Sequence, residues 1–133
     1  MLPFFGQDLF IASEKKGPLT DAAYLSALRT SQELARAKGI DAGLAAHRLD
    51  AFFALSGGPA WVTDLVNGDH FGGSSSTPAA VAGYPSITVP AGDVSGLPVG
   101  VSFFGAAWTE AKLIRFAYAF EQATKARRAP TFK

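Results

Sequence analysis

The length, composition and charge of the chain exclude several classes of protein. It has 133 residues, 48% of them hydrophobic and 17% charged, and no cysteine. The formal net charge of +1 provides no broad field to attract nucleic acid or anionic lipid. Without cysteine, disulfide scaffolds, thiolate zinc sites and cysteine nucleophiles are excluded, and a reducing compartment is favoured. No apolar run approaches the ~18 residues of a membrane span. We therefore predict a cytoplasmic globular protein that binds neither nucleic acid nor membrane.

The first part of the chain, residues 3–48, is predicted to be helical. Thr20 is suited to cap a helix over 21–38, whose Ala- and Leu-rich sequence has a high helical propensity. Gly39 is a typical residue to end that helix. A short helix over 41–47 is expected to follow.

The region 49–105 is predicted to alternate strands with loops. Residues 50–55 form a short, nearly continuous apolar run, which is typical of a strand buried on both faces in a parallel or mixed sheet. Further strands are predicted over 86–89, closed by Pro90-Ala91-Gly92, and over 99–104. Between them and the first strand, Thr77 is the expected N-cap of a short helix that begins with Pro78.

A long helix is predicted over 109–128. Its apolar residues recur at the spacing of one helical face, which indicates a buried stripe of Leu113, Phe116, Ala117, Phe120 and Thr124. The basic residues 125–128 fall at the expected C-terminal end, where the helix dipole favours positive charge. A nucleic-acid partner is not needed to explain them.

These elements predict an α/β fold in a single segment, 1–133, with a partial mixed sheet of about three strands flanked by helices. So small a sheet has two edges, and strands that are buried on both faces need covering. We infer that the strands belong, or once belonged, to a wider sheet. An exposed edge would also allow the chain to form a homo-oligomer.

The polar, Gly-rich loop 60–77 contains the most suggestive local chemistry. Within Gly72-Gly73-Ser74-Ser75-Ser76, one serine could act as a nucleophile, with His70 as its base and Asp64 or Asp69 as the orienting acid. The same residues are typical of a turn before a capped helix, and we favour that reading. His47 and His70 lack the spacing of a metal site, so no metal and no cofactor are predicted.

Two segments resemble a known family. Residues 78–92, PAAVAGYPSITVPAG, and 96–105, GLPVGVSFFG, resemble the C-terminal part of amidase signature enzymes. The final helix and the segment 50–59 are similar to the corresponding regions of that domain. The resemblance covers essentially the whole chain, and it implies that the strands join a large mixed sheet covered by helices.

The resemblance implies an activity whose catalytic residues are not in this chain. The family hydrolyses amide C–N bonds with a Ser–cis-Ser–Lys triad, whose lysine and serines precede the matched region. Gly72–Ser75 imitates the family's Gly-Gly-Ser-Ser-Gly-Gly signature, but Ser76 departs from it. No lysine stands in the family's Lys-Asp-Asn context; the six are Lys15, Lys16, Lys38, Lys112, Lys125 and Lys133. No catalytic residue is carried over, and the isolated chain is predicted to be inactive.

The resemblance also suggests where substrate would bind. The loop 57–73 would help to wall the acyl or leaving-group pocket, so the candidate substrate-binding residues are Trp61, Asp64, Asn67 and His70. The implied partners are the missing N-terminal part of the amidase domain and a small-molecule amide. The alternative hypothesis is a stand-alone, non-catalytic domain that binds a partner or self-associates through an exposed sheet edge.

Overall fold

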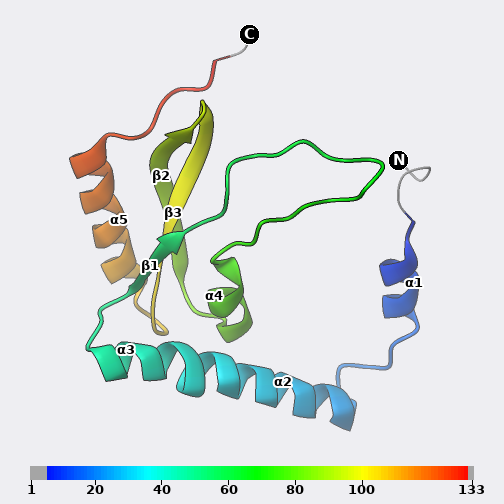
Figure 1. Ribbon diagram of the computed structural model, residues 1–133. Helices are drawn as coiled ribbons and strands as arrows, with labels where there is room; N and C mark the ends of the chain where they lie inside the picture. The colour runs from blue at the N-terminus through cyan, green and yellow to red at the C-terminus, as the bar shows by residue number, and fades with distance from the viewer. Residues whose placement is uncertain (1–5, 132–133) are drawn as a thin grey trace.

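The computed structural model describes residues 6–131 and contains a small sheet with helices on both of its faces (Figure 1). In chain order, the elements are α1 (Asp8–Glu14), α2 (Ala22–Ala35), the π-helical turn η1 (Arg36–Ile40), α3 (Asp41–His47), β1 (Phe52–Leu55), α4 (Ser76–Ala82), β2 (Ser86–Val94), β3 (Leu97–Phe104) and α5 (Glu110–Thr124). The predicted α/β class is therefore confirmed.

The sheet has three strands in the order β1-β3-β2, and both pairs are antiparallel. The expectation that the first strand is buried on both faces is wrong for the described chain. β1 is an edge strand, and its alternate side chains Phe53 and Leu55 are 56% and 66% exposed. No element within residues 6–131 fully covers the face of β1 that carries Phe53 and Leu55, so half of this apolar strand is exposed to solvent.

β2 is longer than predicted because Pro90-Ala91-Gly92 does not end it. The strand continues to Val94 through a bulge between Pro90 and Gly92, which leaves Ala91 without an opposite residue on β3. Proline is tolerated at a bulge in an edge strand, where the ladder of hydrogen bonds is already interrupted. Ser95 and Gly96 then form a tight turn with φ of 52° and 80°, the left-handed pair typical of a two-residue hairpin.

The two faces of the sheet hold separate small cores. On one face, Val89 and Val101 pack against Ala117 of α5. On the other, Phe104 packs with Ile40 and with the small side chains of α4, Ala79 and Ala82. The rings of Phe52 and Phe104 stack on this second face with centroids 5.2 Å apart. Because side chains alternate along β3, this one strand contributes to both cores.

The helices α2, η1 and α3 follow one another without an intervening loop. Gly39 was expected to end the first helix, but it lies inside the π turn, where a Cβ would be 2.6 Å from the Leu34 carbonyl oxygen. Glycine is required there by close backbone approach rather than by a helix end. The helical run ends at Arg48, whose φ is 53°. At its start Asp21, not Thr20, occupies the N-cap position.

α5 confirms most of its predicted stripe but is shorter than expected. Leu113 and Ala117 are buried, and Phe116 and Phe120 are partly buried, whereas Thr124 is exposed. The helix ends at Thr124 because Lys125 has a left-handed φ of 50°. The basic residues beyond it therefore do not form the last helical turn. Arg128 instead pairs with Asp93 of the β2–β3 hairpin, with 3.2 Å between the charged atoms.

Arg36 in the π turn links the helical layer to the end of α4. Its Nε donates a hydrogen bond of 2.6 Å to the Ala82 carbonyl, one of the last carbonyls of α4. Its guanidinium lies 5.8 Å from the centre of the Tyr84 ring. The Tyr84 hydroxyl donates to Asp41 at 2.8 Å, and that hydrogen bond raises the pKa of Tyr84. Arg36 and Tyr84 together thus connect η1, α4 and α3.

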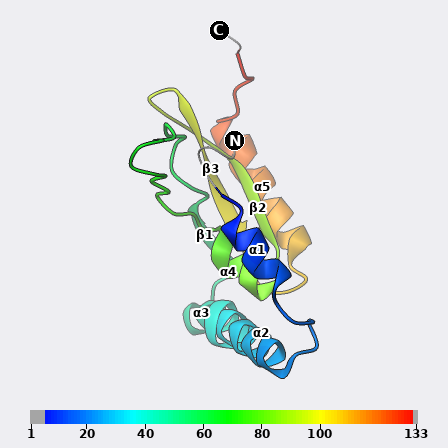
Figure 2. The same cartoon turned by 90° about the vertical axis from the view of Figure 1, so that its right-hand side faces the viewer.

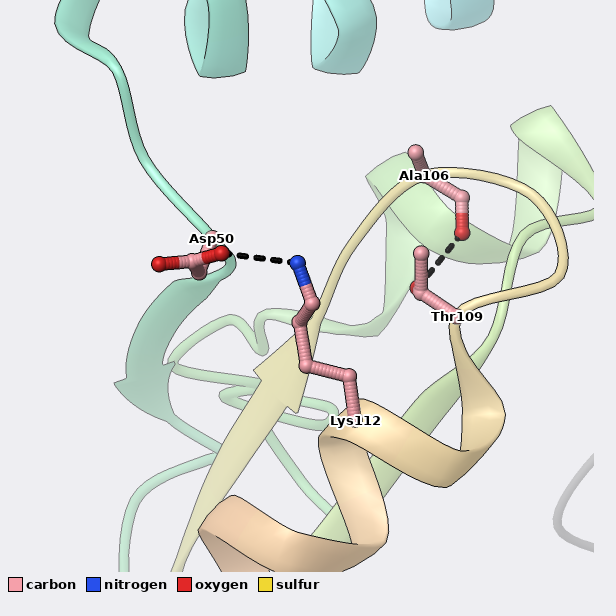
Figure 3. A network of polar contacts seen from close by, with 4 residues as sticks. All are labelled: Asp50, Ala106, Thr109 and Lys112. Carbon is pink, nitrogen blue, oxygen red and sulfur yellow. Dashed lines mark hydrogen bonds and ion pairs between the residues drawn. The ribbon is translucent and has the colours of Figure 1, made fainter.

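Two polar contacts lie at the start of α5 (Figure 3), and one of them, between Lys112 and Asp50, holds the segment before β1 against this helix. Lys112 Nζ donates to Asp50 Oδ1 at 2.7 Å, and Thr109 Oγ1 donates to the Ala106 carbonyl at 2.7 Å. The hydrogen bond from Lys112 and its positive charge lower the pKa of Asp50. The contribution of this pair to stability is therefore present above the ordinary aspartate pKa and is lost as pH falls through the lowered value.

The described chain leaves an unusually large surface uncovered. Its accessible area is 10247 Å², against roughly 6,700 Å² for a compact protein of this mass. Figure 1 shows α1 well away from the sheet, and in Figure 2, which looks at the molecule from that side, α1 lies in front of the sheet. Leu9 and Phe10 on this helix are 83% and 76% exposed. No helix within residues 6–131 is long and apolar enough to cross a membrane. Within the described residues, the helices and strands therefore leave much of their apolar surface exposed.

The contribution of the α5 face to stability can be measured with two adjacent residues. Leu113 is 1% exposed and Ile114 is 56% exposed. Leu113→Ala should lower the free energy of unfolding by about 2–5 kcal/mol, because it leaves a cavity. The control Ile114→Ala should change it by less than about 0.5 kcal/mol. Equal losses in urea unfolding would contradict the packing described for α5.

Candidate functional site

The candidate site is the 56–75 loop, which runs from the end of β1 to the start of α4 and extends away from the sheet (Figure 1). Its two ends are held together. Gly57 and Ser74 form an antiparallel bridge, and the Ser75 N–H donates to the Ser56 carbonyl at 3.3 Å. The Ser56 N–H donates in turn to Gly100 on β3 at 2.8 Å. The base of the loop is therefore an extension of the sheet.

Asp64 folds the tip of the loop. Its Oδ1 accepts hydrogen bonds from the backbone N–H groups of Val66 at 2.8 Å and Asn67 at 2.9 Å. Its Oδ2 accepts from Asn67 Nδ2 at 2.9 Å. These donors, the Asn67 backbone first, lower the pKa of Asp64. Asp64 and Asn67, two of the predicted site residues, are thus brought together, and they structure the loop itself.

Trp61 is the third predicted site residue, and it is held in place within the same loop. Its indole Nε1–H donates to Asp69 Oδ1 at 2.6 Å. The Phe71 ring packs beside it, with centroids 5.9 Å apart. Trp61 stays 45% exposed, and it borders a shallow hollow of about 480 Å³ with Ala60, Thr63 and Asp69. Asp69 is predicted from the sequence only as a candidate catalytic acid, and Phe71 is not among the predicted site residues.

His70, the fourth predicted residue, is exposed and makes no hydrogen bond to another residue within 6–131. The Ser/His/Asp arrangement is therefore not formed in the described chain. Both acids are engaged elsewhere, and the Ser74 and Ser76 hydroxyls lie 2.9 Å from each other. Nor do the described residues group three His, Cys, Asp or Glu side chains that could hold a metal ion.

A cluster of three hydroxyls lies beside the base of the loop and was not predicted. Ser102 Oγ is 2.7 Å from Ser56 Oγ and 2.9 Å from Thr88 Oγ1. One residue comes from each strand of the sheet or its continuation, and Ser102 is only 5% exposed. Thr88 and Ser102 are directly opposite in the ladder, so only the strand register could have revealed the cluster.

Ser75 adjoins this cluster at the start of α4. It occupies the N-cap position, two residues before the predicted cap Thr77, and Pro78 lies in the first turn. Its side chain makes no capping hydrogen bond, and its Oγ is buried without a partner in residues 6–131. The serine-rich segment therefore serves to connect the loop to α4 and to the sheet.

Comparison with known proteins relates this arrangement to amidases. No protein-family model matches the chain. A probable amidase of Arabidopsis thaliana is 36% identical over 129 residues, which are 96% of this chain and 22% of the relative. The peptide amidase from Stenotrophomonas maltophilia superposes with a TM-score of 0.88 at 50% identity, over 99% of this chain and 26% of that one. An amidase family protein from Bacillus anthracis superposes with a TM-score of 0.73 at 35% identity, over 96% and 22%.

These similarities confirm the resemblance drawn from residues 78–105. The chain matches a portion of amidase signature enzymes, in sequence and in three-dimensional structure. It spans about a quarter of the length of these relatives.

The role of Asp64 in ordering the loop leads to a prediction about amide exchange. Asp64→Ala removes the acceptor for the N–H groups of Val66 and Asn67, so both should exchange with solvent about tenfold faster. The control Asp69→Ala leaves these two hydrogen bonds in place and should leave both rates unchanged. Hydrogen exchange followed by NMR measures each amide separately. Unchanged rates in Asp64→Ala would show that the tip is held by other contacts.

Proposed function

We propose that this chain, which matches about a quarter of the length of amidase signature enzymes, forms the C-terminal part of an amidase that hydrolyses carboxylic amide C–N bonds. The observation that carries the proposal is the similarity to the peptide amidase, 50% identical over 99% of the chain. Identity of that level over the whole chain supports a shared role for the matched portion, including the 56–75 loop.

The chemistry would come from residues in the part of the enzyme that this chain does not cover. There a lysine, acting through a bridging serine, would remove the proton of the nucleophilic serine, which then attacks the amide carbonyl carbon. The leaving nitrogen takes up that proton and departs as ammonia or an amine when the C–N bond breaks, and water then hydrolyses the acyl-enzyme. Consistent with a supporting role here, Lys38 pairs with Glu33 and Lys112 pairs with Asp50. The mechanism uses no cofactor.

This chain would complete the sheet and cover of the enzyme. Both outer edges of the three-stranded sheet are open in the described chain. The 10247 Å² of accessible surface exceeds the area of a compact protein of this mass by roughly 3,500 Å². That excess is several times the ~800 Å² which one partner contributes to a standard interface. An enclosing remainder of the same domain accounts for such an area better than a small partner does.

The 56–75 loop would form one wall of the substrate pocket. Trp61, oriented by Asp69, supplies a flat apolar surface with one side free. His70 offers an exposed imidazole, and Asp64 with Asn67 keeps the tip folded. We propose that the substrate is the amide of a peptide or of a similar small molecule, by analogy with the peptide amidase. An indole face suits an apolar side chain of such a substrate.

A chimera tests the proposal directly. The matched quarter of the Stenotrophomonas maltophilia peptide amidase is replaced by this chain, and hydrolysis of a peptide amide is measured by ammonia release. Activity within about tenfold of the parent enzyme is expected, because half of the exchanged residues are identical. The 133-residue chain alone should show no turnover.

Two results would contradict the proposal. A chimera that folds but does not hydrolyse amides would show that this chain cannot fill the amidase role. Turnover by the isolated chain, lost in His70→Ala, would show a local catalytic site. If the folded chimera is inactive and the isolated chain is also stable by itself, as a monomer or an oligomer, the alternative of a stand-alone binding domain would be supported.

The pocket role of Trp61 is tested in the same chimera. Trp61→Ala should raise KM for a peptide amide with a large apolar side chain about tenfold, with a smaller change in kcat, because it removes binding surface and not a reacting group. Glu110→Ala is the control: Glu110 is an exposed residue in the first turn of α5, outside the 56–75 loop, and KM should not change. Equal KM values for the unchanged chimera, the Trp61→Ala variant and the control variant would place Trp61 outside the pocket.

A further inference from the structure

Trp108, in the turn between β3 and α5, is exposed to an unusual degree. It is 91% exposed, more than any other aromatic side chain in residues 6–131. Large aromatic side chains bury a large area when they are covered, and they dominate the energetics of interfaces. An indole left almost wholly in water on a structured turn therefore calls for a physical explanation.

The backbone of Trp108 is unusual, and its ring lies away from the core of the molecule. Its φ is 62°, a left-handed conformation that is uncommon for any residue with a Cβ and an outlier for a bulky one. Trp108 immediately precedes the N-cap Thr109, where an apolar residue commonly packs on the fourth residue of the helix. Here that residue is Leu113, which is already 1% exposed without the indole. The usual local partner is thus not used.

The turn is built to maintain this conformation (Figure 3). Thr109 Oγ1 donates to the Ala106 carbonyl at 2.7 Å, which closes the turn around Ala107 and Trp108. A Cβ at Gly105 would be 3.0 Å from Thr109 Oγ1, so glycine allows the hydroxyl to come close. The Asp50–Lys112 pair fixes the first turn of α5 next to it. Two side-chain contacts therefore hold the backbone on either side of Trp108.

We infer that Trp108 is an anchor that inserts into an apolar pocket in the part of the amidase domain that this chain does not cover. The inference rests on the proposed function. A tryptophan side chain has only two rotatable torsions, so it loses little entropy when it is buried, which makes it an effective hot spot. The chain spans 22–27% of its relatives' length, so the remaining three-quarters of such a domain is large enough to cover the excess surface of roughly 3,500 Å². A second copy is the alternative occupant.

The experiment compares Trp108→Gly in the isolated chain and in the chimera. In the isolated chain this change removes a left-handed side chain and no buried contact, so the unfolding midpoint should stay the same or rise. In the chimera it should lower the midpoint by about 3–5 °C, the effect of deleting a buried aromatic ring from a protein of that size. Opposite responses in the two contexts identify the anchor.

Ser95→Gly is the matched control for backbone strain. Ser95 also has a left-handed φ, 52°, and lies at the exposed hairpin turn. It should not lower the midpoint of either protein. Hydroxyl-radical footprinting gives a second readout: Trp108 oxidation should be at least about tenfold slower in the chimera than in the isolated chain, because the ring is covered.

Two outcomes would overturn the inference, and a third would contradict only the proposed function. Suppose that the chimera hydrolyses amides, that Trp108→Gly does not lower its unfolding midpoint, and that Trp108 is oxidised as fast as in the isolated chain. This result would refute the anchor and leave the amidase proposal intact. Protection of Trp108 in the isolated chain at high concentration, lost on dilution, would assign the ring to a second copy. A folded, inactive chimera that still protects Trp108 would refute only the proposed activity.

Discussion

The structure depends on the two-sided pairing of β3. This strand is hydrogen-bonded to β1 on one side and to β2 on the other, and its alternate side chains enter both small cores. α5 packs on one face through Val101, and α4 with the π turn packs on the other through Phe104. The loop and the β3–α5 turn are held relative to the same strand, by Ser56 on Gly100 and by the residues that follow Phe104.

Local signals in the sequence were sufficient to predict most elements but not how they are covered. Apolar spacing predicted α5 and its buried side chains, and the apolar run at 50–55 predicted β1. Burial on both faces was wrong because it depends on neighbours that residues 6–131 do not provide. Gly39 is predicted to end a helix and Pro90 to end a strand, whereas Gly39 lies within a π turn and Pro90 lies at a bulge in β2. Both features depend on tertiary contacts that local propensity does not contain.

The candidate site was predicted in position and only partly in arrangement. Loop length and composition pointed to Trp61, Asp64, Asn67 and His70, and the structure pairs Asp64 with Asn67. The bond between Trp61 and Asp69 spans eight residues of irregular chain, a distance over which no sequence pattern predicts contact. The hydroxyls of Ser56, Thr88 and Ser102 meet because of strand register, and the left-handed φ of Trp108 is a backbone conformation that its residue type does not predict.

The two outer edges of the sheet are not equivalent, so a further strand can be added at one of them more easily than at the other. On β2, Pro90 and the bulge beside it break the regular row of backbone donors that an added strand needs. β1 has no proline or bulge, and it presents Phe53 and Leu55 next to its free edge. A further strand can therefore be added next to β1 far more readily than next to β2. If that strand is absent, two copies of the chain would associate first through the free edge of β1.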